Sequence, residues 1–154
     1  MIGVAAGGAS GFITAKSSLA ADLSLLASVA AVALLTAGVV LARRRRYDAH
    51  RWVQSSGVVL NAVPVVVWMI VSLARYILPG IPGSLSEHGH GLAALHAVVG
   101  AFGVALGLFL LVRANQLMAR GTSLSRYKPA MRVAYALYVA GAVLGVALYL
   151  VTYG

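Results

Sequence analysis

Residues 23–46 read LSLLASVAAVALLTAGVVLARRRR, and this stretch decides the fold. Its first part, residues 23–42, carries no charged side chain and is rich in Ala, Val and Leu. A helix of ~20 such residues, rising ~1.5 Å per residue, crosses a hydrocarbon core ~30 Å thick. The run stops at a block of arginines, Arg43 to Arg46, so it predicts a transmembrane helix that ends at a membrane surface.

The composition of the whole chain agrees with a membrane protein. Hydrophobic residues make up 61% of the 154 residues and charged residues only 10%, whereas soluble domains carry about 25% charged residues. The net charge of +9 does not predict nucleic-acid binding, because the Lys and Arg residues fall in two short groups between apolar runs. The absence of cysteine excludes disulfides, thiolate metal sites and a c-type haem in this chain.

Apolar runs predict four spans, at about residues 19–42, 51–78, 91–118 and 129–153. Short connections between them favour antiparallel neighbours, so the expected fold is an all-α integral membrane four-helix up-down bundle. Residues 1–18 are expected to be an exported N-terminal lead ahead of a single transmembrane domain, residues 19–154.

The distribution of basic residues predicts the orientation. The two turns that follow the first and third spans hold ten of the twelve Lys and Arg residues, and the other side has only Lys16 and Arg75. By the positive-inside rule both basic turns are cytoplasmic and both termini lie outside, in the plasma (inner) membrane of a prokaryote. Four exposed arginines at this boundary, Arg43, Arg44, Arg45 and Arg46, are also expected to bind anionic lipid headgroups.

Small residues indicate how the spans pack. G-x-x-x-G pairs occur in the third span, with Gly103 and Gly107, and in the fourth, with Gly141 and Gly145. Such residues let transmembrane helices approach closely, so the third and fourth spans are expected to pack backbone to backbone.

Two features at mid-depth of the second span predict an irregular helix. Pro64 removes a backbone hydrogen bond and predicts a kink, and Asn61 is an amide inside the membrane. Asn61 is expected to tie the irregular stretch to a neighbouring helix, with contact to a ligand or a quinone as the alternative.

Four tyrosines of the fourth span fall into two groups by depth. Tyr149 and Tyr153 suit an outer interfacial belt, and Tyr135 and Tyr138 lie deeper, where their hydroxyl groups should find partners.

Residues 87–96, EHGHGLAALH, hold three of the four histidines and open the third span. His96 is the histidine placed inside a span, and an ionisable residue there is a functional hypothesis by default. His50 lies at the opposite membrane surface, ~40 Å away along the second span, and cannot share a ligand with the others.

Three interpretations of His96 remain open. In the first, His96 and Met69 are axial ligands of a b-type haem, because both lie ~8–12 Å below the outer surface. In the second, His96 joins Glu87, His88 and His90, in a Gly-flanked loop, to hold copper or zinc at the outer face. In the third, His96 is a neutral residue hydrogen-bonded to Tyr or Asn inside the bundle.

Three stretches carry a family resemblance: YDAHRWVQSSGVVLN (47–61), LHAVVGAFGVALGL (95–108) and RYKPAMRVAYALYVAGAVLGVALYLVTYG (126–154). Residues 43–154 resemble the domain-of-unknown-function 420 family of CtaM/YozB-like four-span membrane proteins. The resemblance implies a role in assembly or maturation of haem-copper terminal oxidases, and it matches His50 and His96 to family histidines. The chain departs from the family at residues 72–80 and 126–132, where other members carry further histidines.

Together these features predict a non-enzymatic accessory protein of the respiratory membrane, whose partners are lipid and another integral membrane protein such as a terminal oxidase subunit. The alternatives are a b-type haem or quinone-linked electron carrier that uses His96, and a structural subunit of a larger complex. Catalysis is not expected, because the three acids, Asp22, Asp48 and Glu87, lie at or beyond the predicted membrane boundaries.

Overall fold

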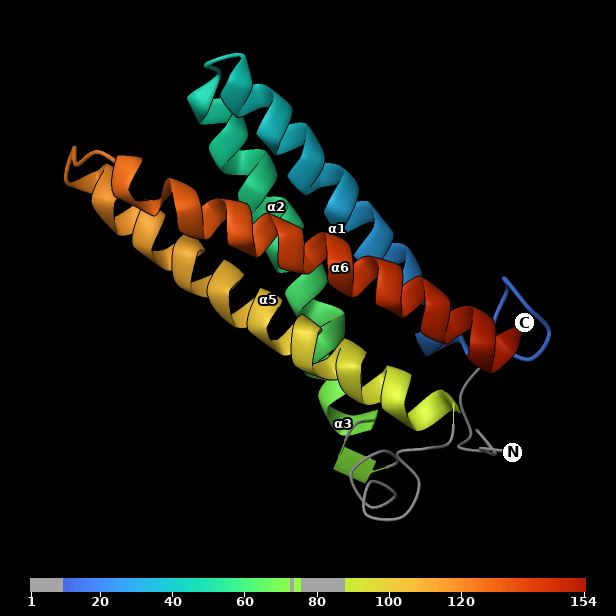
Figure 1. Cartoon of the computed structure of the whole chain (residues 1–154). Coiled ribbons are helices and arrows are strands. Elements are labelled where there is room, and N and C mark those ends of the chain that lie inside the picture. The colour runs from blue at the N-terminus through green and yellow to red at the C-terminus, as the bar shows by residue number, and fades with distance from the viewer. Residues whose placement is uncertain (1–9, 73, 76–87) are drawn as a thin grey trace.

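The computed structural model describes residues 10–72, 74–75 and 88–154, and it confirms an all-α bundle of four helices long and apolar enough to span a membrane (Figure 1). The first is α1 (Leu19–Arg43), and the second is α2 (Tyr47–Pro64), which continues through the π-helix η1 (Val65–Met69) into α3 (Ile70–Ser72). The third is α5 (His88–Ala119), and the fourth is α6 (Lys128–Tyr153), preceded by the short 3₁₀ helix η4 (Ser125–Tyr127).

The helices pair as two antiparallel hairpins. The closest contacts are between α1 and α2 and between α5 and α6, and the hairpins then meet mainly through α1 and α6. The two turns, after α1 and after α5, lie at one end of the bundle, and the C-terminus lies at the other, beside residues 10–18 (Figure 1). This is the up-down arrangement that the short connections predicted.

Both turns are tight for the same backbone reason. After α1, Arg45 adopts a left-handed conformation, φ 57°, and the amide of Arg46 donates to the carbonyl of Leu41. After α5, Gly121 has φ 65° and the amide of Thr122 donates to the carbonyl of Leu117. These bonds are those of a Schellman motif, which ends a helix and reverses the chain.

Most of the bundle surface is apolar. In each span only 17% to 22% of the residues of its most apolar window are buried, so most apolar side chains face outward, as expected for contact with lipid. The central core is formed by Leu35, Val58 and Tyr138, with Val32, Leu111 and Tyr135 packed against it.

Glycines hold α5 and α6 together, as the G-x-x-x-G pairs predicted. A Cβ atom built on Gly103 would lie 3.5 Å from the Cβ of Leu137, and one on Gly141 would lie 3.9 Å from the Cα of Gly100. One on Gly107 would collide with the ring of Tyr138. Gly103 and Gly141 thus lie in van der Waals contact across the interface, and Gly107 is the position where a side chain would not fit.

Candidate functional site

A small cavity lies at the centre of the bundle, where the two hairpins meet. Its volume is about 30 Å³, and a single water needs ~10–15 Å³ on the same measure, so it has room for one or two small species. All four spans contribute to its wall, which is formed by Ser28, Asn61, Val65, Met69, His96, Gly100, Gly103, Leu137, Tyr138, Gly141 and Ala142.

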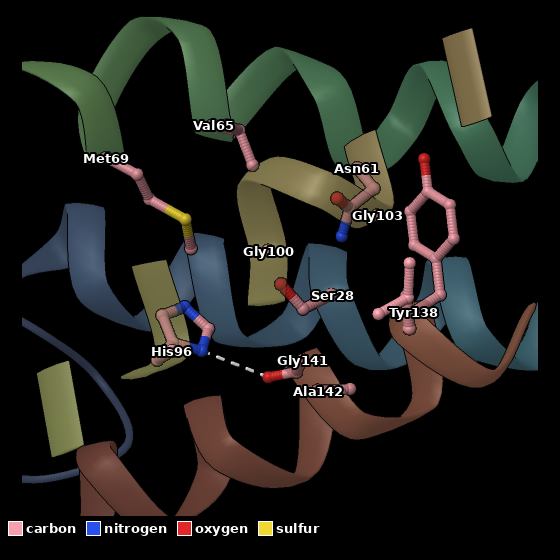
Figure 2. A pocket seen from close by; sticks show the side chains of 11 residues that line it. Ser28, Asn61, Val65, Met69, His96, Gly100, Gly103, Tyr138, Gly141 and Ala142 are labelled. Atoms are coloured by element: carbon pink, nitrogen blue, oxygen red, sulfur yellow. Dashed lines mark hydrogen bonds between the residues drawn. The ribbon is translucent and has the colours of Figure 1, made fainter. Parts of the chain in front are cut away.

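His96 is fixed in the wall of this cavity by α6. Its Nδ1 lies 3.0 Å from the carbonyl oxygen of Gly141 (Figure 2). A carbonyl oxygen can only accept, so Nδ1 carries the proton and, in the neutral ring, Nε2 carries the lone pair. Gly145 makes room for the ring, because a Cβ there would lie 3.1 Å from Cε1 of His96. The imidazole is thus held in one tautomer and one position.

Met69 reaches the same cavity from the second span. Pro64 lacks a backbone donor, and the chain after it continues as a π-helix, in which the amide of Ile70 donates to the carbonyl of Val65. The predicted irregularity at Pro64 therefore takes the form of a widened turn instead of a sharp break. Met69 is the last residue of this turn, and the end of its side chain points toward the His96 ring (Figure 2).

Three polar side chains complete the wall. Ser28 comes from α1 and Asn61 from α2, and both line the middle of the cavity (Figure 2). The Tyr138 ring closes one end, with its hydroxyl turned away from His96 toward α2. That hydroxyl is buried without a hydrogen-bond partner in the described part of the chain, so the expected partner for Tyr138 is not found. Tyr135, in contrast, lies 2.9 Å from the hydroxyl of Thr36, as expected.

The structure brings His96 and Met69 together, as the haem interpretation required, but it leaves no space for a haem between them. A cavity of about 30 Å³ takes an ion or one or two waters and not a porphyrin ring. The packing of α5 against α6 at Gly103 and Leu137 closes the space on one side.

The expected outer-face metal group lies mostly outside the described residues, and the structure describes only the backbone of His88 and His90. His88 and His90 were predicted in a loop, but their backbone forms the first turn of α5, and this part of the prediction is wrong. The chain can continue as a helix there because glycine is unfavourable in a helix by only ~1 kcal/mol. Glu87 and the side chains of both histidines lie outside the described residues. Among the side chains that are described, no group of three or more His, Asp or Glu gathers that could hold a metal.

His50 links α2 to α1 in the same way that His96 links α5 to α6. Its Nδ1 lies 2.7 Å from the carbonyl oxygen of Gly38, which links the start of α2 to α1. Gln54, one turn further along α2, donates to the carbonyl of Leu35 at 3.1 Å. Polar residues near this end of the bundle therefore hold helices together.

Arg51 continues this pattern between the hairpins. Its Nε donates to the side-chain oxygen of Asn115 on α5 at 2.9 Å, and its guanidinium lies 5.8 Å from the centre of the Trp52 ring. The four arginines of the turn, Arg43 to Arg46, are exposed at the same end and are free to meet lipid headgroups.

Asp22 is a residue whose importance the sequence did not reveal. Its side chain is completely buried at the start of α1, where it accepts from the amides of Phe12 at 2.6 Å and Ile13 at 2.8 Å. The hydroxyl of Tyr149 donates to its other oxygen at 2.6 Å. Tyr149 is therefore a buried hydrogen-bond donor, and it lies one turn before the end of α6. Asp22 in the first turn of an apolar helix, four residues after the N-cap Ser18, was the signal available.

No protein-family model, no curated protein and no solved structure matches this chain.

Proposed function

We propose that this protein is a non-enzymatic accessory protein of a prokaryotic respiratory membrane, which helps to assemble or stabilise a haem-copper terminal oxidase. The observation that carries the proposal is the cavity of about 30 Å³ among all four spans. It is polar enough to hold a small species, and it is too small to admit and release an organic substrate.

The use of the polar residues supports the same proposal. His50, Gln54 and Arg51 bond across helix boundaries, and Asp22 and Tyr149 tie α1 to α6. Each of these polar groups has a structural role as a bond between helices, which suits a protein that acts by binding a partner. The family resemblance of residues 43–154 supplies the respiratory context of the proposal.

The alternative functions are less well supported. An electron carrier with haem between His96 and Met69 needs more space than the cavity provides. A structural subunit bound through the glycine faces of α5 and α6 needs those faces to be free, but Gly103 and Gly141 are used in packing α5 against α6.

The test is deletion of the gene in the organism that encodes the chain. We expect oxidase activity in isolated membranes, and the haem and copper content of the purified oxidase, to fall, and a plasmid copy to restore both. The tagged chain should also be recovered with oxidase subunits from detergent extracts. Unchanged oxidase activity and cofactor content in the deletion strain would rule the proposal out.

A further inference from the structure

We propose that His96 and Met69 form a binding site for a single copper(I) ion inside the bundle. The biological role of this copper rests on the function proposed above, because copper is a cofactor of haem-copper oxidases. The site itself is argued from the geometry of the cavity.

The state of His96 is that of a metal ligand. Histidines that bind metals donate the proton of the second ring nitrogen to a carboxylate, a backbone carbonyl or water, which fixes the tautomer and aims the lone pair. Here Nδ1 donates to the carbonyl of Gly141 at 3.0 Å, and Gly145 leaves space for the ring. Among the described residues no group donates a hydrogen bond to Nε2, which faces the cavity (Figure 2).

Met69 supplies the second ligand atom, a soft thioether sulfur. Methionine in an apolar helix is usually a packing residue. In this chain, however, its side chain enters the cavity beside His96, and its terminal methyl group lies nearest the His96 ring with the sulfur one bond behind it (Figure 2). Rotation about the bond between Cγ and the sulfur would swing the methyl group aside and turn the sulfur lone pairs toward the ring. The π-helical turn after Pro64 places it there, and single π-helical turns inside α-helices are frequent at functional sites.

The residues that line the cavity favour Cu(I) over Cu(II) and Zn²⁺. Thioether sulfur favours Cu(I) over Cu(II), and Zn²⁺ in structural sites takes four ligands, commonly thiolates and imidazoles. No carboxylate is among the residues that line the cavity, so a second positive charge would be uncompensated. A monovalent ion with neutral ligands suits this site, and Ser28 and Asn61 line the same cavity further along (Figure 2).

The experiment uses the full chain, purified in detergent under anaerobic, reducing conditions. Cu(I) is titrated in competition with a colorimetric Cu(I) chelator, and X-ray absorption at the copper edge identifies the ligand atoms. We expect one tightly held equivalent with sulfur and nitrogen ligands. His96→Ala and Met69→Leu should each weaken binding by at least about tenfold.

Two variants serve as matched controls. Met131→Leu removes a thioether elsewhere on α6, and His50→Ala removes the histidine of the other hairpin, and both should bind copper like the unaltered protein. Met69→Leu conserves side-chain volume, so it is expected to fold even if His96→Ala does not. No bound equivalent in the unaltered protein, or full retention with no sulfur signal in Met69→Leu, would overturn the proposal.

The copper site and the proposed function can fail separately. If the protein binds Cu(I) through both residues while deletion of the gene leaves the oxidase unchanged, the site stands and the function falls. If deletion impairs the oxidase but the purified protein binds no Cu(I), the function stands and the site falls.

Discussion

His96 on α5 donates the proton of its Nδ1 to the backbone carbonyl of Gly141 on α6, across 3.0 Å. A hydrogen bond from a side chain to a helix carbonyl within the membrane fixes the rotation of one helix relative to the other. The ring is accommodated by Gly145, one turn along α6. The contacts of His96 with Gly141 and Gly145 therefore set both the register of α5 against α6 and the position of the imidazole in the cavity.

The first prediction concerns Gly145. Gly145→Val places a branched side chain where a Cβ alone would lie 3.1 Å from His96, so it should displace the ring and destabilise the protein by about 1–3 kcal/mol. The measurement is thermal unfolding in detergent. Gly100→Ala is the matched control, because nothing lies within 4 Å of its Cβ position, and it should be neutral or stabilising. Equal loss of stability in both variants would contradict the close contact between Gly145 and the His96 ring.

The second prediction compares two tyrosines of α6. Tyr138→Phe removes a buried hydroxyl that has no partner in the described part of the chain, and it should stabilise the protein by about 1 kcal/mol or more. Tyr135→Phe removes the hydrogen bond to Thr36 and should destabilise it by about 0.5–1.5 kcal/mol. Opposite shifts of the unfolding midpoint in detergent are expected, and shifts of the same sign would show that the Tyr138 hydroxyl is satisfied.

The third prediction concerns the first hairpin. A Cβ on Gly38 would lie 2.7 Å from Nε2 of Gln54, so Gly38→Ala should push that side chain from the carbonyl of Leu35 and lower stability. Gln54→Ala alone loses one hydrogen bond, but in combination it makes room for the new methyl group. A double-mutant cycle should therefore give a coupling energy of about 0.5–3 kcal/mol, and simple additivity would contradict the contact.

The fourth prediction concerns the segment before α1. Residues 12 and 13 are bound by Asp22, which Tyr149 holds in place, so Tyr149→Phe should loosen residues 10–18. Trypsin can cut after Lys16 within this segment, and we expect the cut to be several-fold faster in the variant. Thr152→Val is the control, because Thr152 is exposed and bonds only to its own helix through Leu148. Unchanged cleavage in Tyr149→Phe would show that Asp22 holds the segment without the tyrosine.

The fifth prediction concerns orientation. We expect the turns that contain Arg45 and Thr122 to face the cytoplasm, because they carry most of the basic residues. A cysteine at Thr122 should react with an impermeant thiol reagent only after the membrane is opened. A cysteine at Ser10 should react in intact cells. The reverse labelling pattern would invert the topology.

The fold could be predicted from the sequence because lipid imposes simple requirements. A helix must be long enough to cross the bilayer and basic residues must gather at its ends, and both requirements are visible in residues 19–46. The close approach of α5 and α6 could also be predicted, since the pairs Gly103/Gly107 and Gly141/Gly145 put small residues on one face of each span.

The site was only partly predictable. The similar depth of His96 and Met69 follows from the rise per residue, but the hydrogen bond to Gly141 depends on how α5 is rotated against α6, which hydropathy does not encode. The contact between Asp22 and Tyr149 joins residues 127 positions apart and requires residues 10–18 to fold back over α1. The sequence predicted an irregularity at Pro64, but it did not indicate that the chain would continue as a π-helical turn.

Each hairpin is closed by its own histidine, His50 to Gly38 in one and His96 to Gly141 in the other. Each half of the molecule therefore carries its own bond between its two helices. The cavity is lined from both halves, so a shift of one half against the other would change its size and leave both bonds in place.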